Sequence, residues 1–187
     1  MSDSAEKTVT APAKEKAAKS EEAPTPIYTG YDLDYFIAPD DLTEAAGKLD
    51  QAGFFLEDIS CLDMQEGFQV VYHFDRFDQP GRVVLRVMID RETPEISSIR
   101  DIYAGADWHE RECFDFFGII FKGHPNLLPI LLDPDHQGPP PLIKNESARK
   151  DLHELYPGRA HSPVDVRSEK FVREITNCSN PKYRNPL

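Results

Sequence analysis

Proline interrupts the second half of this chain and limits what can form there. The sequence has 16 prolines among 187 residues. Proline lacks a backbone N–H and disfavours helical geometry in the residue before it, so long helices or strands are not expected where prolines recur. Most of them follow residue 118, at Pro125, Pro129, Pro134, Pro139, Pro140, Pro141, Pro157, Pro163, Pro181 and Pro186.

The same proline-broken half carries many apolar side chains. Apolar surface of this extent must be buried against something, and an extended chain that proline already restricts loses little entropy on docking. We therefore predict that residues 123–187 form an extended arm that binds a neighbouring subunit. The apolar residues are Leu127, Leu128, Ile130, Leu131, Leu132, Leu142, Ile143, Leu155, Tyr156, Phe171, Val172 and Ile175.

The N-terminal segment differs in composition from the rest. Residues 1–26 mix Ala, Lys, Glu, Ser and Pro and contain no aromatic residue. Such a segment buries too little apolar surface to offset its ordering entropy, so we predict a disordered tail. It has acidic residues, no arginine and no apolar run, which does not fit a secretory or mitochondrial targeting peptide. We expect the chain in the cytoplasm.

Charge and cysteine content argue against several function classes. The net charge is −12, from 33 acidic and 21 basic residues, which disfavours nucleic-acid binding. No apolar run reaches the roughly 18 to 20 residues of a membrane span, so membrane contact is expected only through a partner. Cys61, Cys113 and Cys178 are scattered, whereas an iron–sulfur cluster or structural zinc site needs four ligands. We expect no cofactor or metal in this chain.

Residues 27–122 have the pattern of an α+β domain. A helix is predicted after Pro39-Asp40-Asp41, with Gly53 as its C-cap and an apolar stripe at Leu42, Ala45, Ala46 and Leu49. Strands are predicted at 54–62, 67–74, 82–89 and 96–102, and Asp107 is the expected N-cap of a second helix. Hairpin-linked strands with separate helices favour a single domain with helices on one face of a mainly antiparallel sheet.

The second helix concentrates charge beside aromatic residues. Trp108, Arg111 and Asp115 share one face, Arg111 and Asp115 are spaced as an i, i+4 pair, and Glu112 lies beside them. One interpretation is an ordinary solvated helix with surface ion pairs. The other is a charged network at the edge of a buried interface, where each charge needs a partner. Gly118 is expected to end this helix.

The helix also admits two catalytic interpretations. His109 and Cys113, with Glu110 adjacent, nearly match the zinc pattern HExxH, but no third ligand follows at a fixed spacing. Cys113 with His109 or His124 could form a nucleophile and base, although the nearby phenylalanines would raise the pKa of the thiol. His124 fits better as a hydrogen-bonding residue at a tight corner.

The second helix and the corner after it form one continuous motif. It reads Glu110-Arg111-Glu112-x-x-Asp115-x-x-Gly118-Ile119-x-Phe121-x-Gly123-His124-Pro125-x-Leu127. This motif resembles the signature of the 30-kDa subunit of respiratory complex I, an NADH-quinone oxidoreductase. That family includes the equivalent subunit of energy-converting membrane hydrogenases. The resemblance implies a cofactor-free structural subunit on the cytoplasmic side of the membrane. It would pack on the large subunit that holds the quinone or nickel–iron site, beside an iron–sulfur subunit. The expected interface residues are Trp108, Glu110, Arg111, Glu112, Asp115, Gly118, Phe121, Gly123, His124, Pro125 and Leu127.

The sequence departs from this family after Leu127. The family usually has two arginines where this chain has Leu128 and Pro129, and its Leu-Arg-Lys-Asp stretch is replaced here by residues 142–145, Leu-Ile-Lys-Asn. The changes indicate an altered partner surface. They leave two complexes open, an NADH:quinone oxidoreductase and a membrane-bound hydrogenase or related ferredoxin-driven complex.

Overall fold

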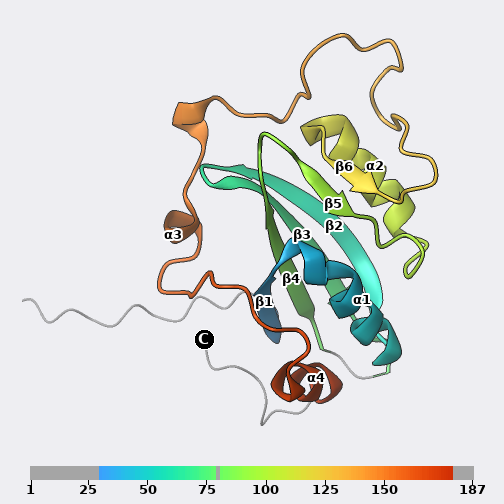
Figure 1. Ribbon diagram of the computed structural model, residues 1–187, viewed down its shortest axis with the longest axis vertical. Helices are drawn as coiled ribbons and strands as arrows, with labels where there is room; N and C mark the ends of the chain where they lie inside the picture. The colour runs from blue at the N-terminus through green and yellow to red at the C-terminus, as the bar shows by residue number, and fades with distance from the viewer. Residues whose placement is uncertain (1–29, 79–80, 179–187) are drawn as a thin grey trace, which may run out of the picture.

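The computed structural model of the chain describes residues 30–78 and 81–178, shown in Figure 1. The predicted disordered tail, residues 1–26, lies outside the described residues. The elements in chain order are β1 (Leu33–Ile37), the 3-10 turn η1 (Pro39–Asp41), α1 (Leu42–Gln51), β2 (Phe55–Met64), β3 (Gly67–Asp75), β4 (Val83–Ile89), β5 (Glu95–Ser97), α2 (Ala106–Phe117), β6 (Ile120–Lys122), η2 (Glu146–Ala148), α3 (Leu152–Leu155) and α4 (Glu169–Thr176).

Four strands form the main sheet in the order β1-β4-β3-β2. The pairs β2–β3 and β3–β4 are antiparallel, whereas β1 lies parallel to β4. The predicted α+β class with a mainly antiparallel sheet is therefore confirmed. Strand β1 was not predicted, because its sequence shows no polar–apolar alternation: Tyr35 and Ile37 point into the main core while Phe36 packs on the opposite face.

Helices α1 and α2 cover one face of the sheet. Alternate residues of β3, from Phe68 to Phe74, point into the core on that side. The predicted helical stripe is confirmed, since its four apolar side chains are completely buried. Gly53, with φ of +83°, lies just beyond the helix, as a C-terminal glycine should. The stripe consists of Leu42, Ala45, Ala46 and Leu49.

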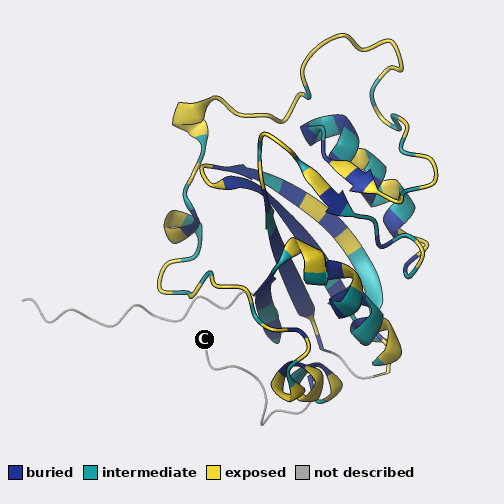
Figure 2. Ribbon diagram, in the orientation of Figure 1, coloured by how far each residue is buried: buried dark blue, intermediate teal, exposed yellow. Residues whose placement is uncertain are grey.

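The proline-rich arm folds back over its own domain. Helix α4 inserts Phe171 and Ile175 into the main core, and α3 places Leu152 beside Phe36 and Met64 on the second face of the sheet. In Figure 2 the stretch that precedes α3 is mostly exposed, whereas α3 and α4 each include buried residues. For these helices the expectation that a neighbouring subunit buries the apolar arm residues is wrong. Short helices fit between the prolines and reach the sheet directly.

Two local predictions also change. The strand expected at 96–102 is confined to β5, which pairs in parallel with β6, because the backbone N–H of Ile99 binds the Glu110 carboxylate instead of another strand. Helix α2 begins one residue before Asp107, so Asp107 lies in its first turn and Gly105 takes the cap position. Within the described ranges, no helix is long and apolar enough to cross a membrane.

Candidate docking site around helix α2

Two faces of helix α2 contact different parts of the chain: one packs on the sheet, and the other binds the start of the arm. Glu110, Cys113 and Phe117 are buried toward the sheet. Arg111, together with the buried Asp115, instead forms hydrogen bonds with the start of the arm. The helix ends at Gly118, whose positive φ of 73° suits glycine and whose N–H donates to the Phe114 carbonyl at 2.9 Å. Gly118 therefore ends the helix as predicted.

Asp115 binds three successive backbone N–H groups of the arm. Its Oδ2 accepts hydrogen bonds from Ile130, Leu131 and Leu132 at 2.9, 2.7 and 3.1 Å. Burial by itself raises the pKa of this carboxyl group, but the three backbone donors outweigh burial, and the pKa lies below its ordinary value. Asp115 is therefore ionised at neutral pH, and its charge holds the loop.

Arg111 binds the same loop one step earlier. Its Nε donates to the Leu128 carbonyl at 2.8 Å, and its Nη2 donates to the Pro129 carbonyl at 2.9 Å. Arg111 and Asp115 thus do not form hydrogen bonds with each other. Both side chains instead form hydrogen bonds with backbone atoms of residues 128–132. We call Arg111 and Asp115 the clamp, and residues 128–132 the clamped loop.

Glu110 lies inside the domain. It is fully buried, and its carboxylate accepts hydrogen bonds from Ser98 Oγ at 2.6 Å and from Ile99 N at 2.8 Å. Burial raises its pKa to about 7 despite both donors, and the nearby Asp107 adds to the rise. The residue ties the turn after β5 to α2, so it positions the helix that carries the clamp.

His124 forms the corner at which the arm begins. Its side chain is buried, its Nδ1 accepts from the Asn126 N–H at 3.1 Å, and its Nε2 lies 3.3 Å from the Asp107 carbonyl. The first contact makes Nε2 the protonated nitrogen. Gly123 precedes it with φ of +86°. These contacts agree with a hydrogen-bonding corner residue.

The remaining predicted interface residues divide by exposure. Trp108 is 66 % exposed on the outer face of α2, and Glu112 and Pro125 are exposed as well. Phe121 is buried in the core, and Leu127 is partly buried and packs against the core. The structure therefore brings the clamp and the corner together, and leaves Trp108 and Glu112 exposed to solvent.

The two catalytic interpretations find no support in the geometry. Among the described residues, no group of three or more His, Cys, Asp or Glu side chains is arranged to hold a metal ion. The Cys113 thiol donates a hydrogen bond to the Ile59 carbonyl at 3.9 Å. Burial, together with the nearby Glu112 carboxyl group, raises the pKa of this thiol to about 12. A thiol in that state supplies almost no thiolate at neutral pH.

Sequence reasoning missed a second anchor for the arm. Asp63 on β2 is fully buried and ion-paired with Arg91, and its Oδ2 accepts from Lys144 N at 2.7 Å and from Arg149 Nε at 3.2 Å. Burial raises the pKa of Asp63, but the hydrogen bonds outweigh it and hold the pKa low. In the sequence Asp63 is only an acidic residue in a strand, so nothing there marks it.

Between these anchors the arm arches past the C-terminal end of α2 (Figure 1). On its return, Leu142 N donates to the Phe116 carbonyl at 3.1 Å. Apolar side chains remain exposed along this stretch, with Leu128 at 57 %, Leu131 at 62 %, Leu142 at 49 % and Ile143 at 39 %. We call these four side chains the exposed arm face.

The fold and the anchored loop define a single-domain α+β protein with a backbone-held, apolar arm. Its sequence matches the family described as "Respiratory-chain NADH dehydrogenase, 30 Kd subunit" over residues 35–151. The chain belongs to this family, which confirms the resemblance found in the signature stretch. It is therefore a subunit of a complex I-type oxidoreductase.

Curated relatives carry names from more than one complex. The chain is 38 % identical over 116 residues to an NADH-quinone oxidoreductase subunit of Roseiflexus sp. (strain RS-1), covering 58 % of this chain and 67 % of the relative. It is 38 % identical over 81 residues to an F(420)H(2) dehydrogenase subunit of Methanosarcina mazei, covering 43 % and 51 %. The chain thus spans between about half and two thirds of these relatives' lengths.

A solved structure shares the fold. It belongs to the membrane-bound sulfane sulfur reductase, an archaeal respiratory membrane complex. The TM-score is 0.56 at 22 % identity, over 71 % of this chain and 81 % of that chain. At this level of identity the likeness concerns the fold alone.

Proposed function

We propose that this chain is a cofactor-free structural subunit of the hydrophilic arm of a complex I-type NADH:quinone oxidoreductase. It packs on the large quinone-site subunit beside an iron–sulfur subunit, on the cytoplasmic side of the membrane, and reaches the membrane only through these partners. Its contribution to electron transfer coupled to ion translocation is to hold two electron-carrying neighbours at a fixed distance and to exclude water from their joint.

The exposed arm face carries this proposal. A flexible loop could turn Leu128 and Leu131 inward, but the clamp fixes five backbone groups around them: two carbonyls through Arg111 and three N–H groups through Asp115. The two leucines remain more than half exposed. Apolar side chains that are held rigid and exposed favour docking, because little further entropy is lost when a partner covers them.

The anchors bind only the backbone of the loop. Arg111 binds carbonyl oxygens, which every residue has, so Leu128 and Pro129 can stand in place of arginines without loss of the clamp. The side chains at these positions are then free to match the partner. Backbone contacts of this kind allow the clamp to hold the loop with any side chains at these positions. The side chains can then form a partner surface that is specific to this chain.

Co-purification from the native membrane tests the proposal. The double variant Leu128→Ser, Leu131→Ser should lose the large subunit by about tenfold or more, because buried apolar anchors dominate interface energy. Val172→Ser is the matched control, since Val172 is also exposed but lies on α4, in another part of the arm. Normal recovery of the large subunit with the double variant would contradict the proposal.

A second candidate keeps the structural role in a membrane-bound energy-converting nickel–iron hydrogenase or related ferredoxin-driven complex. The apolar residues Leu128 and Ile143, which stand where the family resemblance expects arginine, favour a partner surface of a different kind. The co-purified large subunit distinguishes the two, because nickel ligation requires two CxxC pairs in that subunit.

A further inference from the structure

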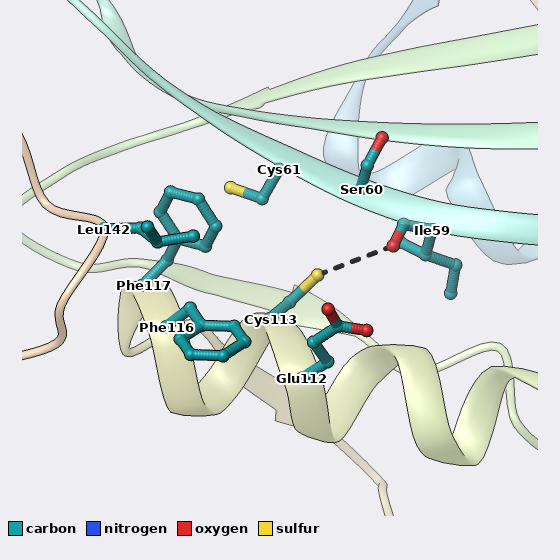
Figure 3. Close-up of a pocket in the computed structure, with 8 residues that line it drawn as sticks. All are labelled: Ile59, Ser60, Cys61, Glu112, Cys113, Phe116, Phe117 and Leu142. Carbon is teal, nitrogen blue, oxygen red and sulfur yellow. Dashed lines mark hydrogen bonds between the residues drawn. The ribbon is translucent and has the colours of Figure 1, made fainter. Parts of the chain in front are cut away.

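A pocket of about 170 Å³ lies between strand β2 and helix α2. Figure 3 shows Cys61 of β2 facing Phe116 and Phe117 of α2, with Leu142 of the arm beside Phe117 and Glu112 toward the other end. Small-molecule sites occupy roughly 300–1,000 Å³. This pocket is smaller, so it suits a single side chain.

The walls of the pocket are mainly apolar, and its one charged group is Glu112. The two phenylalanine rings, Leu142 and the thiol of Cys61 supply the apolar contacts. Glu112 is exposed, and no described residue forms a hydrogen bond or an ion pair with its carboxylate. A carboxylate at the edge of an apolar pocket selects a side chain with an apolar stem and a cationic head.

The surrounding charge reinforces this selectivity. The carboxyl groups of Glu112, Glu110 and Asp58 lie close enough to the neighbouring Cys113 thiol to raise its pKa further. Arg111, the cation next to Glu112 in the chain, is engaged elsewhere, because it binds the clamped loop. Among the described residues that line the pocket, Glu112 therefore supplies a negative charge and none is a cation.

Thiol chemistry does not explain the pocket. Burial raises the pKa of the Cys61 thiol far above its ordinary value, and burial raises that of Cys113 to about 12. Both thiols therefore line the pocket as small apolar groups rather than as nucleophiles or metal ligands.

We propose that the pocket between β2 and α2 receives one arginine side chain of the subunit that docks on the arm. Its stem lies along Phe116 and Leu142, and its guanidinium binds the carboxylate of Glu112. Arginine is favoured over lysine because a planar guanidinium can lie against an aromatic ring and bind a carboxylate through two N–H groups. This inference rests on the proposed function and adds the chemistry of the partner: an arginine flanked by apolar residues that cover the exposed arm face.

Photo-crosslinking in the intact complex tests the assignment. A diazirine-bearing amino acid replaces Leu142, which lies at the pocket and is 49 % exposed, so the larger side chain has room. After irradiation of native membranes, the cross-linked peptide is identified by mass spectrometry. The expected product joins residue 142 to a peptide of another subunit that contains arginine next to the linked position.

Charge variants then test the role of Glu112. Glu112→Gln should lower the cross-link yield by about tenfold, the effect of losing one charge-assisted hydrogen bond. Asp101→Asn, at a carboxylate that is 87 % exposed in the turn before α2, is the matched control and should leave the yield unchanged. Glu112→Arg combined with an acidic residue at the identified partner arginine should restore the yield.

Three outcomes would overturn the inference. They are a cross-link to residues 1–29 or 179–187 of the same chain, a partner peptide without arginine, and a yield that Glu112→Gln leaves unchanged. If the chain co-purifies normally with the large subunit and one of these occurs, only the pocket assignment fails. If no larger subunit co-purifies, the proposed function fails and the pocket assignment fails with it.

Discussion

Arg111 and Asp115 lie one helical turn apart on α2, yet they meet through the arm. Arg111 donates to the carbonyls of Leu128 and Pro129, and Asp115 accepts from the N–H groups of residues 130–132. The positive side chain thus binds the carbonyl groups of one short loop, and the negative side chain binds its N–H groups. Two side chains with an ordinary i, i+4 spacing on a helix therefore orient a loop that has no regular secondary structure of its own.

Loss of the Asp115 charge should release the clamped loop. Asp115→Asn removes the carboxylate that accepts three N–H groups. Hydrogen bonds to a charged group contribute about 1.5–3 kcal/mol each, so amide exchange at residues 130–132 should accelerate by about 10- to 100-fold. Hydrogen-exchange mass spectrometry checks this, with Glu112→Gln on the same helix as the control. Equal protection in both variants would show that the loop is held by other contacts.

Replacement of Arg111 should impair assembly more than turnover. Arg111→Ala removes both donors to the loop, and the exposed arm face then loses its fixed orientation. Arg111→Lys should give an intermediate result, because an ammonium cannot reproduce the two-pronged contact of a guanidinium. The measurement is the amount of assembled complex and the turnover per assembled complex. Normal assembly with slow turnover in Arg111→Ala would instead assign the residue a catalytic role.

Glu110 should make stability depend on pH. Its pKa is about 7 in the folded chain and near 4.5 in the unfolded chain, so folding favours the protonated form between these values. The resulting stabilisation is complete below pH 4.5 and is lost as the pH rises through about 7. Glu110→Gln keeps the shape without the charge, so its advantage over the wild type should grow by about 3 kcal/mol across this window.

Urea unfolding at several pH values measures that difference. The comparison between Glu110→Gln and the wild type cancels the other titrating groups, which both proteins share. Val172→Ala serves as the control, because it removes an exposed side chain without a titrating group and its difference from the wild type should stay flat. A flat difference for Glu110→Gln as well would mean that Glu110 stays ionised when buried.

The folding of the arm onto its own domain predicts a stability effect at Phe171. This side chain is 1 % exposed and its ring centroid lies 5.2 Å from that of Tyr35 on β1. Phe171→Ala should lower the free energy of unfolding by about 3–5 kcal/mol, as for other buried aromatic residues. Val172→Ala, at the next and exposed position, should change it by less than about 0.5 kcal/mol. Equal small effects would mean that α4 does not belong to the folded core.

Local sequence rules determined much of the domain. The apolar stripe from Leu42 to Leu49 and the alternation in β3 depend on periodicity alone, and both elements form as predicted. Gly118 ends α2 because few other residues adopt a positive φ. The signature stretch also indicated the family, because its fixed positions lie within one continuous segment.

Only the tertiary structure decided what the signature residues do. The sequence shows that Arg111 and Asp115 are close, but not that both form hydrogen bonds with the backbone of residues 128–132. It likewise holds no sign that Asp63 anchors Lys144 across 81 positions, or that Phe171 returns to β1. These contacts join segments far apart in the chain, and such contacts depend on how the whole chain packs rather than on any local pattern.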